Sequence, residues 1–222
     1  MATRIALIAG ASGLVGGECL TRLVRHPRYD RVIAFVRQPL SITHAKLEQR
    51  VIDFETLETL PDFPASDDVF CCLGTTMKKA KGSEQAFRRV DYDYVVHLAQ
   101  RARAAGAQQF LLVSAIGAGA KSPIFYNRVK GEAEEAVARL GFPGYYVFRP
   151  SILAGDRPEH RPAERLGLAV ASGVSIALVG PLRKYRPIQA GTVAEAMVRV
   201  AVKAPGGVNV YASDIIERLA QE

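Results

Sequence analysis

Short apolar runs alternate along the chain with longer stretches in which apolar residues recur every three or four positions. The short runs are typical of buried strands and the longer stretches of helices, several of which begin near Ser or Thr and end at Gly or Pro. The predicted strands are Ile5–Ala9, Arg31–Val36, Arg50–Ile52, Val69–Cys72, Phe110–Val113, Tyr145–Phe148 and Val208–Tyr211. The predicted helices are Leu14–Arg25, Ser83–Ala105, Ile124–Leu140, Thr192–Lys203 and Asp214–Ala220. This alternation predicts an α/β fold with a doubly wound parallel sheet.

One segment, Ile152–Gly191, departs from the alternation. It is rich in Pro, Gly and Arg, and the only helix expected in it lies near Pro162–Ala171. Ligands of open α/β sheets bind outside the carboxyl ends of the strands, so this segment is expected to form a small cap on the substrate side of the sheet. The 222 residues suit one domain, which we expect to span residues 1–222 with the cap at about 152–191.

Three glycines spaced three apart follow the first predicted strand. Such glycines let the chain turn sharply and bring backbone N–H groups against a pyrophosphate at the start of the next helix. The spacing is G-x-x-G-x-x-G, whereas the commonest dinucleotide fingerprint is G-x-G-x-x-G, so the assignment also depends on the strand before it and the helix after it. The alternative is a tight turn without a ligand. The expected pyrophosphate-binding residues are Gly10, Ala11, Ser12, Gly13, Leu14, Val15 and Gly16.

The ends of the second and third predicted strands carry two further candidates. NAD-binding folds usually place an acidic residue at the end of the second strand to bind the ribose 2′-hydroxyl, and here that position holds Arg37. A guanidinium can bind a 2′-phosphate, so NADP is favoured over NAD; the alternative is a solvated strand end. Asp53 is a candidate for the adenine amino group or, equally, for the N-cap of the turn at Phe54–Leu57.

The fourth predicted strand ends in a loop that would also border the cofactor. Its candidates are Leu73, Gly74, Thr75 and Thr76. The glycine permits close approach, and the threonines offer hydroxyl and N–H groups to ribose and phosphates, although a plain exit from a strand has a similar composition.

The catalytic candidates are Ser114, Tyr126 and Lys130. The tyrosine and the lysine are four residues apart in a predicted helix, which places them on one face, and the serine ends the fifth predicted strand. A nearby ammonium lowers the pKa of a phenol, which can then exchange a proton with a carbonyl or alcohol oxygen while a nicotinamide exchanges hydride. The serine would bind and orient the same oxygen. We also expect Ser114, Tyr126 and Lys130 to contact the bound cofactor.

Three segments carry a resemblance to a known family: Phe70–Thr76, Phe125–Glu132 and Val147–Ser151. With them, the chain resembles the atypical branch of the short-chain dehydrogenase/reductase superfamily, and most closely the Tat-interacting-protein oxidoreductase-like family, of which it looks like a bacterial relative. The resemblance implies a Rossmann-type fold and NADPH binding. It also implies that Tyr126 donates the proton, Lys130 binds ribose and Ser114 orients the substrate.

Two departures from the superfamily pattern bear on activity. The helix that often carries an asparagine for a proton relay has Asp91 as its nearest candidate, and the large substrate domain of the extended enzymes is replaced by the short cap. Two hypotheses follow: an NADP-dependent oxidoreductase acting on a small substrate, or an NADPH-binding regulatory module with little turnover. A homodimer or a protein partner would suit the second.

Composition limits the partners and the cellular compartment that we expect for this protein. The net charge is +7, but the basic residues are scattered and do not interleave with aromatic residues, so nucleic acid is not the expected partner. The function of the basic segment Arg157–Arg165 stays open. The four histidines lack metal-ligand spacing, and the three cysteines suit a reducing compartment, so we expect a metal-free cytoplasmic protein. No uncharged stretch is long enough to suggest a membrane span.

Overall fold

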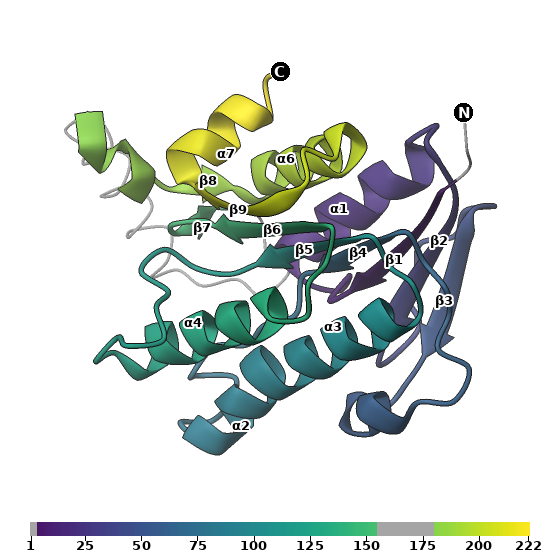
Figure 1. Cartoon of the computed structure of the whole chain (residues 1–222), viewed down its shortest axis with the longest axis horizontal. Helices are drawn as coiled ribbons and strands as arrows, with labels where there is room; N and C mark the ends of the chain where they lie inside the picture. The colour runs from purple at the N-terminus through teal and green to yellow at the C-terminus, as the bar shows by residue number, and fades with distance from the viewer. Residues whose placement is uncertain (1–3, 155–179) are drawn as a thin grey trace.

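The computed structural model describes residues 4–154 and 180–222. Seven strands form a sheet in the order β3-β2-β1-β4-β5-β6-β9, and each neighbouring pair is parallel (Figure 1). The strands are β1 (Arg4–Ala9), β2 (Tyr29–Val36), β3 (Leu47–Val51), β4 (Asp68–Cys71), β5 (Gln109–Val113), β6 (Gly144–Arg149) and β9 (Gly207–Ala212). The predicted α/β fold with a doubly wound parallel sheet is confirmed.

Helices cover both faces of the sheet. Figure 1 shows α1 (Leu14–Arg25), α6 (Ala190–Lys203) and α7 (Ser213–Leu219) on one side, and α2 (Glu84–Arg88), α3 (Tyr94–Ala104) and α4 (Phe125–Ala138) on the other. Successive strand residues point to opposite faces, so Ile8 belongs to the core beneath α1 and Leu7 to the core beneath α3. Burial on both faces explains why the central strands are continuous apolar runs rather than alternating ones.

The predicted helix Ser83–Ala105 is interrupted in the structure. Ser83 caps α2 by accepting a hydrogen bond from the N–H of Ala86 at 3.1 Å, but a π-helical turn, η2 (Arg89–Asp93), separates α2 from α3. This turn places the Asp91 side chain in the interior, where it meets partners far away in sequence. The helical periodicity of the sequence continues through Arg89–Asp93 and does not indicate this turn.

Strand β3 begins three residues earlier than the predicted Arg50–Ile52 and ends one residue earlier. Its residues are half-buried or exposed, because β3 lies at the edge of the sheet beside β2 only. An edge strand of this kind needs no apolar run, and that is why the sequence pattern located it poorly.

The described part of the cap is small. It contains β7 (Leu153–Ala154), β8 (Ile188–Gln189) and the short 3-10 helix η3 (Gly180–Tyr185), and β7 pairs in parallel with β8. Helix α6 begins at Ala190, just inside the expected end of the cap. The helix expected at Pro162–Ala171 and the basic segment Arg157–Arg165 lie outside the described residues.

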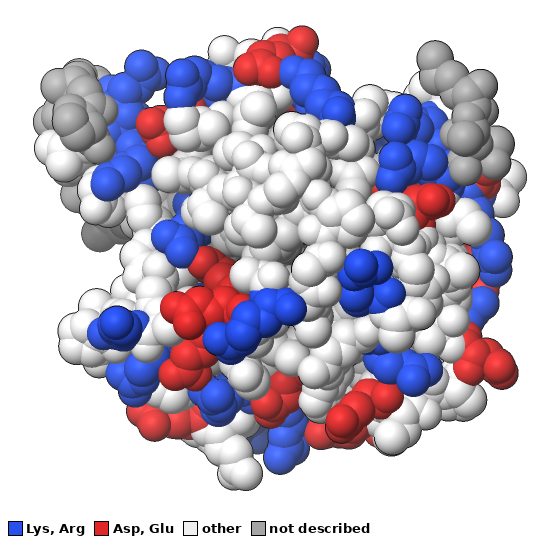
Figure 2. Space-filling view, in the orientation of Figure 1, with Lys and Arg blue, Asp and Glu red and all other residues white. Residues whose placement is uncertain are grey.

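Charges of both signs are interleaved over much of the face drawn in Figure 2. They alternate in its lower part, where α2 and α4 lie. Arg88 of α2 is paired with Glu132 of α4, and Arg89 is paired with Glu55. Exposed pairs of this kind contribute little to stability, but they divide the basic charge into small local groups.

A buried polar cluster holds the amino ends of the central strands together. The Asp68 carboxylate is paired with Arg4, accepts a hydrogen bond from the Tyr29 hydroxyl at 2.8 Å, and accepts another from the Gln109 amide at 2.6 Å. Burial raises the pKa of the Asp68 carboxyl more than these partners lower it. Three side chains, from β1, β2 and β5, are thus fixed around one carboxylate of β4.

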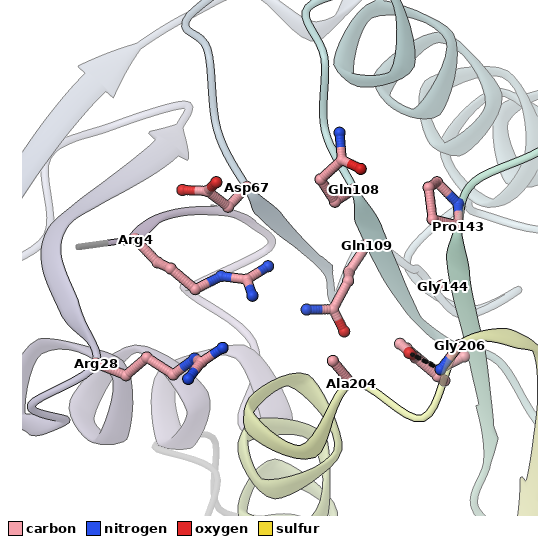
Figure 3. Close-up of a pocket in the computed structure, with 10 residues that line it drawn as sticks. Arg4, Arg28, Asp67, Gln108, Gln109, Pro143, Gly144, Ala204 and Gly206 are labelled. Carbon is pink, nitrogen blue, oxygen red and sulfur yellow. Dashed lines mark hydrogen bonds between the residues drawn. The ribbon is translucent and has the colours of Figure 1, made fainter. Parts of the chain in front are cut away.

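A cavity of about 490 Å³ opens beside this cluster. In Figure 3 the Arg4 guanidinium points toward Gln109, and Gly144 and Gly206 line the far wall. The cavity lies at the amino edge of the sheet, opposite the edge at which open α/β sheets bind their ligands.

We expect Asp68→Ala to lower the free energy of unfolding by about 3 kcal/mol, because it leaves the Arg4 guanidinium unpaired near the interior. Urea unfolding measures the change. The matched control is Asp30→Ala, which removes an exposed carboxylate from the same end of β2 and should change stability by less than about 0.5 kcal/mol. Equal effects of the two variants would contradict a stabilising function for the cluster.

Candidate active site

The glycine turn forms where two backbones and a helix meet too closely for a side chain. Gly10 follows β1 with φ +88°, and a Cβ built there would lie 2.3 Å from the carbonyl oxygen of Cys72. A Cβ on Gly16 would lie 2.1 Å from the carbonyl oxygen of Gly10. Only glycine at both positions lets β1, the exit of β4 and the first turn of α1 pack together.

The amino end of α1 has the properties of an anion site. Gly13 is the N-cap and supplies no side-chain acceptor, so the first-turn N–H groups keep their hydrogen-bonding capacity and the positive end of the helix dipole is open. Ser12 and Gly13 are exposed there. The strand order also reverses between β1 and β4, which is the topological switch point where such sheets bind dinucleotides. The residues of this turn therefore fit a dinucleotide pyrophosphate.

The two candidates for nucleotide selectivity occupy exposed positions. Arg37 directly follows β2, and among the described residues it forms no hydrogen bond or ion pair. Asp53 caps the short helix η1 (Phe54–Thr59) by accepting a hydrogen bond from the N–H of Glu55 at 3.0 Å. The N-cap predicted as one alternative for Asp53 is thus present.

The loop after β4 is held by the Asp91 carboxylate. The N–H of Thr75 donates to Asp91 Oδ2 at 2.8 Å, and a Cβ on Gly74 would lie 3.4 Å from both Asp91 Oδ1 and Lys130 Nζ. Leu73 packs on the core, whereas the Thr76 hydroxyl accepts a hydrogen bond from the N–H of Lys79 at 3.1 Å. The predicted loop thus lies against the predicted lysine.

Lys130 is a buried cation with a buried partner. Its Nζ lies 2.8 Å from Asp91 Oδ1, and the two side chains are 8% and 0% exposed. Burial by itself would lower the pKa of Lys130, but the Asp91 carboxylate and the Tyr126 phenol outweigh it, so the pKa is raised. Lys130 is therefore an ammonium at neutral pH, held against the loop after β4.

Tyr126 lies one turn before Lys130 on the same face of α4. Its ring packs against Phe87, with 5.3 Å between the ring centres, and its side chain is half-buried. Close packing fixes α4, since a Cβ on Gly131 would lie 2.2 Å from the carbonyl carbon of Gly119. Tyr126 thus packs against an aromatic ring on one side and lies one helical turn from Lys130.

Ser114 directly follows β5, is buried, and points toward a partner that the sequence did not suggest. Its hydroxyl donates to Glu134, which is also bound by the Arg149 guanidinium, whose Nε lies 3.1 and 3.2 Å from the two carboxylate oxygens. Arg149 is therefore an ion-pair residue. Glu134 was missed, although it lies four residues after Lys130 and eight after Tyr126, on the same helix face.

The described residues contain no group suited to a metal site and no helix suited to spanning a membrane. Within residues 4–154 and 180–222, no group of three or more His, Cys, Asp or Glu side chains is arranged to hold a metal ion. Of the described helices, none is long and apolar enough to cross a membrane.

Comparison with known proteins agrees with the geometry. A family model described as NAD(P)H-binding matches residues 10–203. Protein HTATIP2 of Rattus norvegicus is 40% identical over 170 residues, which span 75% of this chain and 69% of the rat protein. This chain is an atypical short-chain dehydrogenase/reductase. The resemblance predicted from its motifs is confirmed.

Other relatives of this dehydrogenase/reductase have mitochondrial names. Protein fmp52, mitochondrial, of Aspergillus fumigatus is 33% identical over 210 residues, which span 91% of this chain and 88% of the fungal protein. The cytoplasmic location expected from the cysteines therefore does not follow from the family.

Solved structures of low sequence identity share the fold of this dehydrogenase/reductase. UDP-N-acetylglucosamine 4-epimerase from Methanobrevibacter ruminantium M1 has a TM-score of 0.69 at 14% identity, covering 100% of this chain and 81% of the epimerase chain. The Bordetella bronchiseptica enzyme WbmH in complex with NAD+ has a TM-score of 0.69 at 15% identity, covering 98% and 79%. At such identities the likeness shows the Rossmann-type fold and not the activity.

We expect Gly16→Ala to weaken NADPH binding at least about tenfold and to destabilise the protein, because its Cβ would displace the start of α1 from Gly10. Fluorescence titration with NADPH and urea unfolding measure the two effects. Gly17→Ala is the matched control: it changes the next residue of the same helix, where a Cβ would lie 3.4 Å from the carbonyl oxygen of Ala11. Similar affinities for both variants would contradict the predicted pyrophosphate site.

Proposed function

We propose that this protein is an NADP(H)-dependent oxidoreductase that interconverts a carbonyl and an alcohol on a small substrate. The observation that carries the proposal is the buried Lys130 ammonium, one turn from Tyr126 and against the loop after β4. When bound, the nicotinamide would supply or accept hydride. The turn at residues 10–16, the loop at residues 73–76 and Lys130 would hold the cofactor.

In this proposal Tyr126 is the acid/base. Its phenol gives a proton to the carbonyl oxygen in reduction and takes one from the alcohol in oxidation. The Lys130 ammonium stabilises the phenolate, since an adjacent positive charge favours the charged form of a phenol. The Phe87 ring covers one side of Tyr126 and reduces its contact with water.

Ser114 would bind the same substrate oxygen by accepting a hydrogen bond from it. Its hydroxyl proton is directed to Glu134, so the Ser114 oxygen has lone pairs to offer a substrate hydroxyl. Arg149 keeps the Glu134 carboxylate in place as the acceptor. The serine thus orients the alcohol form of the substrate.

Asp53 would accept a hydrogen bond from the adenine amino group. Its carboxylate can accept this bond in addition to the one from the N–H of Glu55.

The preference for NADP over NAD rests on Arg37. Arg37 is exposed at the end of β2 with its guanidinium unpaired among the described residues. A 2′-phosphate would supply the missing partner, whereas an unmodified ribose would not.

We expect Arg37→Asp to shift the ratio of NADPH to NADH affinity by at least about tenfold toward NADH, since it replaces a phosphate-binding cation by an anion that repels phosphate. Fluorescence titration with each cofactor measures the ratio. Arg25→Asp makes the same charge change at the far end of α1 and should leave the ratio unchanged. An unaltered ratio in Arg37→Asp would refute the assignment.

We expect Tyr126→Phe to lower carbonyl reduction about 100-fold or more while NADPH still binds, because the phenol supplies the proton but contributes little to cofactor affinity. A panel of aldehydes and ketones with NADPH measures turnover. Tyr185→Phe, at an exposed position on η3, is the control and should keep full activity. If Tyr126→Phe retains wild-type turnover, Tyr126 is not the acid/base.

A second candidate function is an NADPH-binding regulator with little turnover. The observations that favour it are the use of the Ser114 hydroxyl proton by Glu134 and the neutralisation of Lys130 by Asp91, which leave fewer groups for a substrate. Such a protein would change its homodimer or protein-partner binding with NADPH. Sedimentation with and without NADPH, and NADPH binding without turnover across the panel, distinguish this function from the first.

The proposed location is the cytoplasm. The described structure has three unpaired cysteines, two of them buried, which suits any reducing compartment. Fractionation of cells that express the full chain would decide between the cytoplasm and another compartment.

A further inference from the structure

The structure gives Asp91 a place that its position in the sequence does not suggest. Its side chain is fully buried in the π-helical turn η2, and each of its carboxylate oxygens faces a different segment. Oδ1 faces Lys130 Nζ on α4, and Oδ2 accepts the N–H of Thr75 in the loop after β4. One carboxylate therefore joins the catalytic helix to the loop of the cofactor site.

We propose that Asp91 is a positioning residue, whose carboxylate fixes the Lys130 ammonium and the Thr75 loop as one unit and offsets the positive charge that reaches Tyr126. The inference rests on the proposed function, in which Tyr126 exchanges the proton. In this inference Asp91, acting through Lys130, helps to set the acidity of the Tyr126 phenol. Neither Asp91 nor Glu134 touches the reacting atoms in this proposal.

The electrostatic argument follows from burial. Two charges 2.8 Å apart interact strongly when water is excluded, and their fields largely cancel at a third group nearby. Lys130 alone would favour the Tyr126 phenolate, whereas the ion pair favours it less. An asparagine at position 91 could still accept the Thr75 N–H, but it would leave the ammonium uncompensated.

Among the residues that the structure describes, the other groups around Lys130 and Tyr126 do not supply a comparable charge. Burial raises the pKa of the Cys71 thiol on β4 to about 12, so it is neutral. From η2 and α2, Tyr92 packs against the apolar cluster of Tyr126, and Arg88 is paired with Glu132 of α4. Asp91 is thus the carboxylate paired with Lys130.

The test is the titration of Tyr126 in the full chain without substrate, by the ultraviolet difference spectrum of tyrosinate. Subtracting the spectrum of Tyr126→Phe isolates Tyr126 from the other tyrosines. We expect Asp91→Asn to lower the pH at which Tyr126 ionises by about one unit. Asp93→Asn, which changes the next carboxylate of the same turn, should leave it unchanged.

A shift below about 0.3 unit in Asp91→Asn, or an equal shift in Asp93→Asn, would overturn the proposal. Because the readout needs no turnover, it is independent of the proposed oxidoreductase activity, which Tyr126→Phe tests separately. If Asp91→Asn does not fold, Asp91→Asn combined with Lys130→Met provides the decision. Recovery of folding in that double variant supports a coupled charge pair, and failure to recover refutes it.

Discussion

The site depends on one steric constraint, the contact of three backbone segments behind Gly10. The turn out of β1, the exit of β4 and the first turn of α1 meet at distances that exclude a Cβ at Gly10 and Gly16. This contact holds the amino end of α1 over the gap where the strand order reverses. If α1 lay farther from the sheet, its N–H groups would lose their position over that gap, and a cofactor bound there would lose those contacts.

A second ordering principle operates along α4. Tyr126, Lys130 and Glu134 recur every four residues, so one helix face presents a phenol, an ammonium and a carboxylate in sequence. Behind them lie Asp91 and Arg149, each paired with a member of that face. Buried charges are costly unless paired, and the pairing makes this face stable and also fixes the direction of each side chain.

The polar groups at the two edges of the sheet lie in different surroundings. At the amino edge, Asp68 and its partners close a polar cluster around one carboxylate beside a cavity. At the carboxyl edge, exposed groups such as Ser12 and Arg37 stay open to a ligand, and the buried pairs lie beneath the loop that would contact it. The same kind of interaction, a buried carboxylate with several donors, thus appears in two settings with different consequences.

The sequence by itself determined the central strands, the glycine turn and the shared helix face of Tyr126 and Lys130. These features follow from local spacing: an apolar run buried on both faces, three glycines before a helix, and two side chains four residues apart. Only the tertiary structure decided the rest. The contacts of Asp91 with Thr75 and with Lys130, and that of Ser114 with Glu134, join residues 16 to 39 positions apart. Such contacts depend on how helices pack on the sheet, and a buried charge takes whichever partner that packing brings within reach.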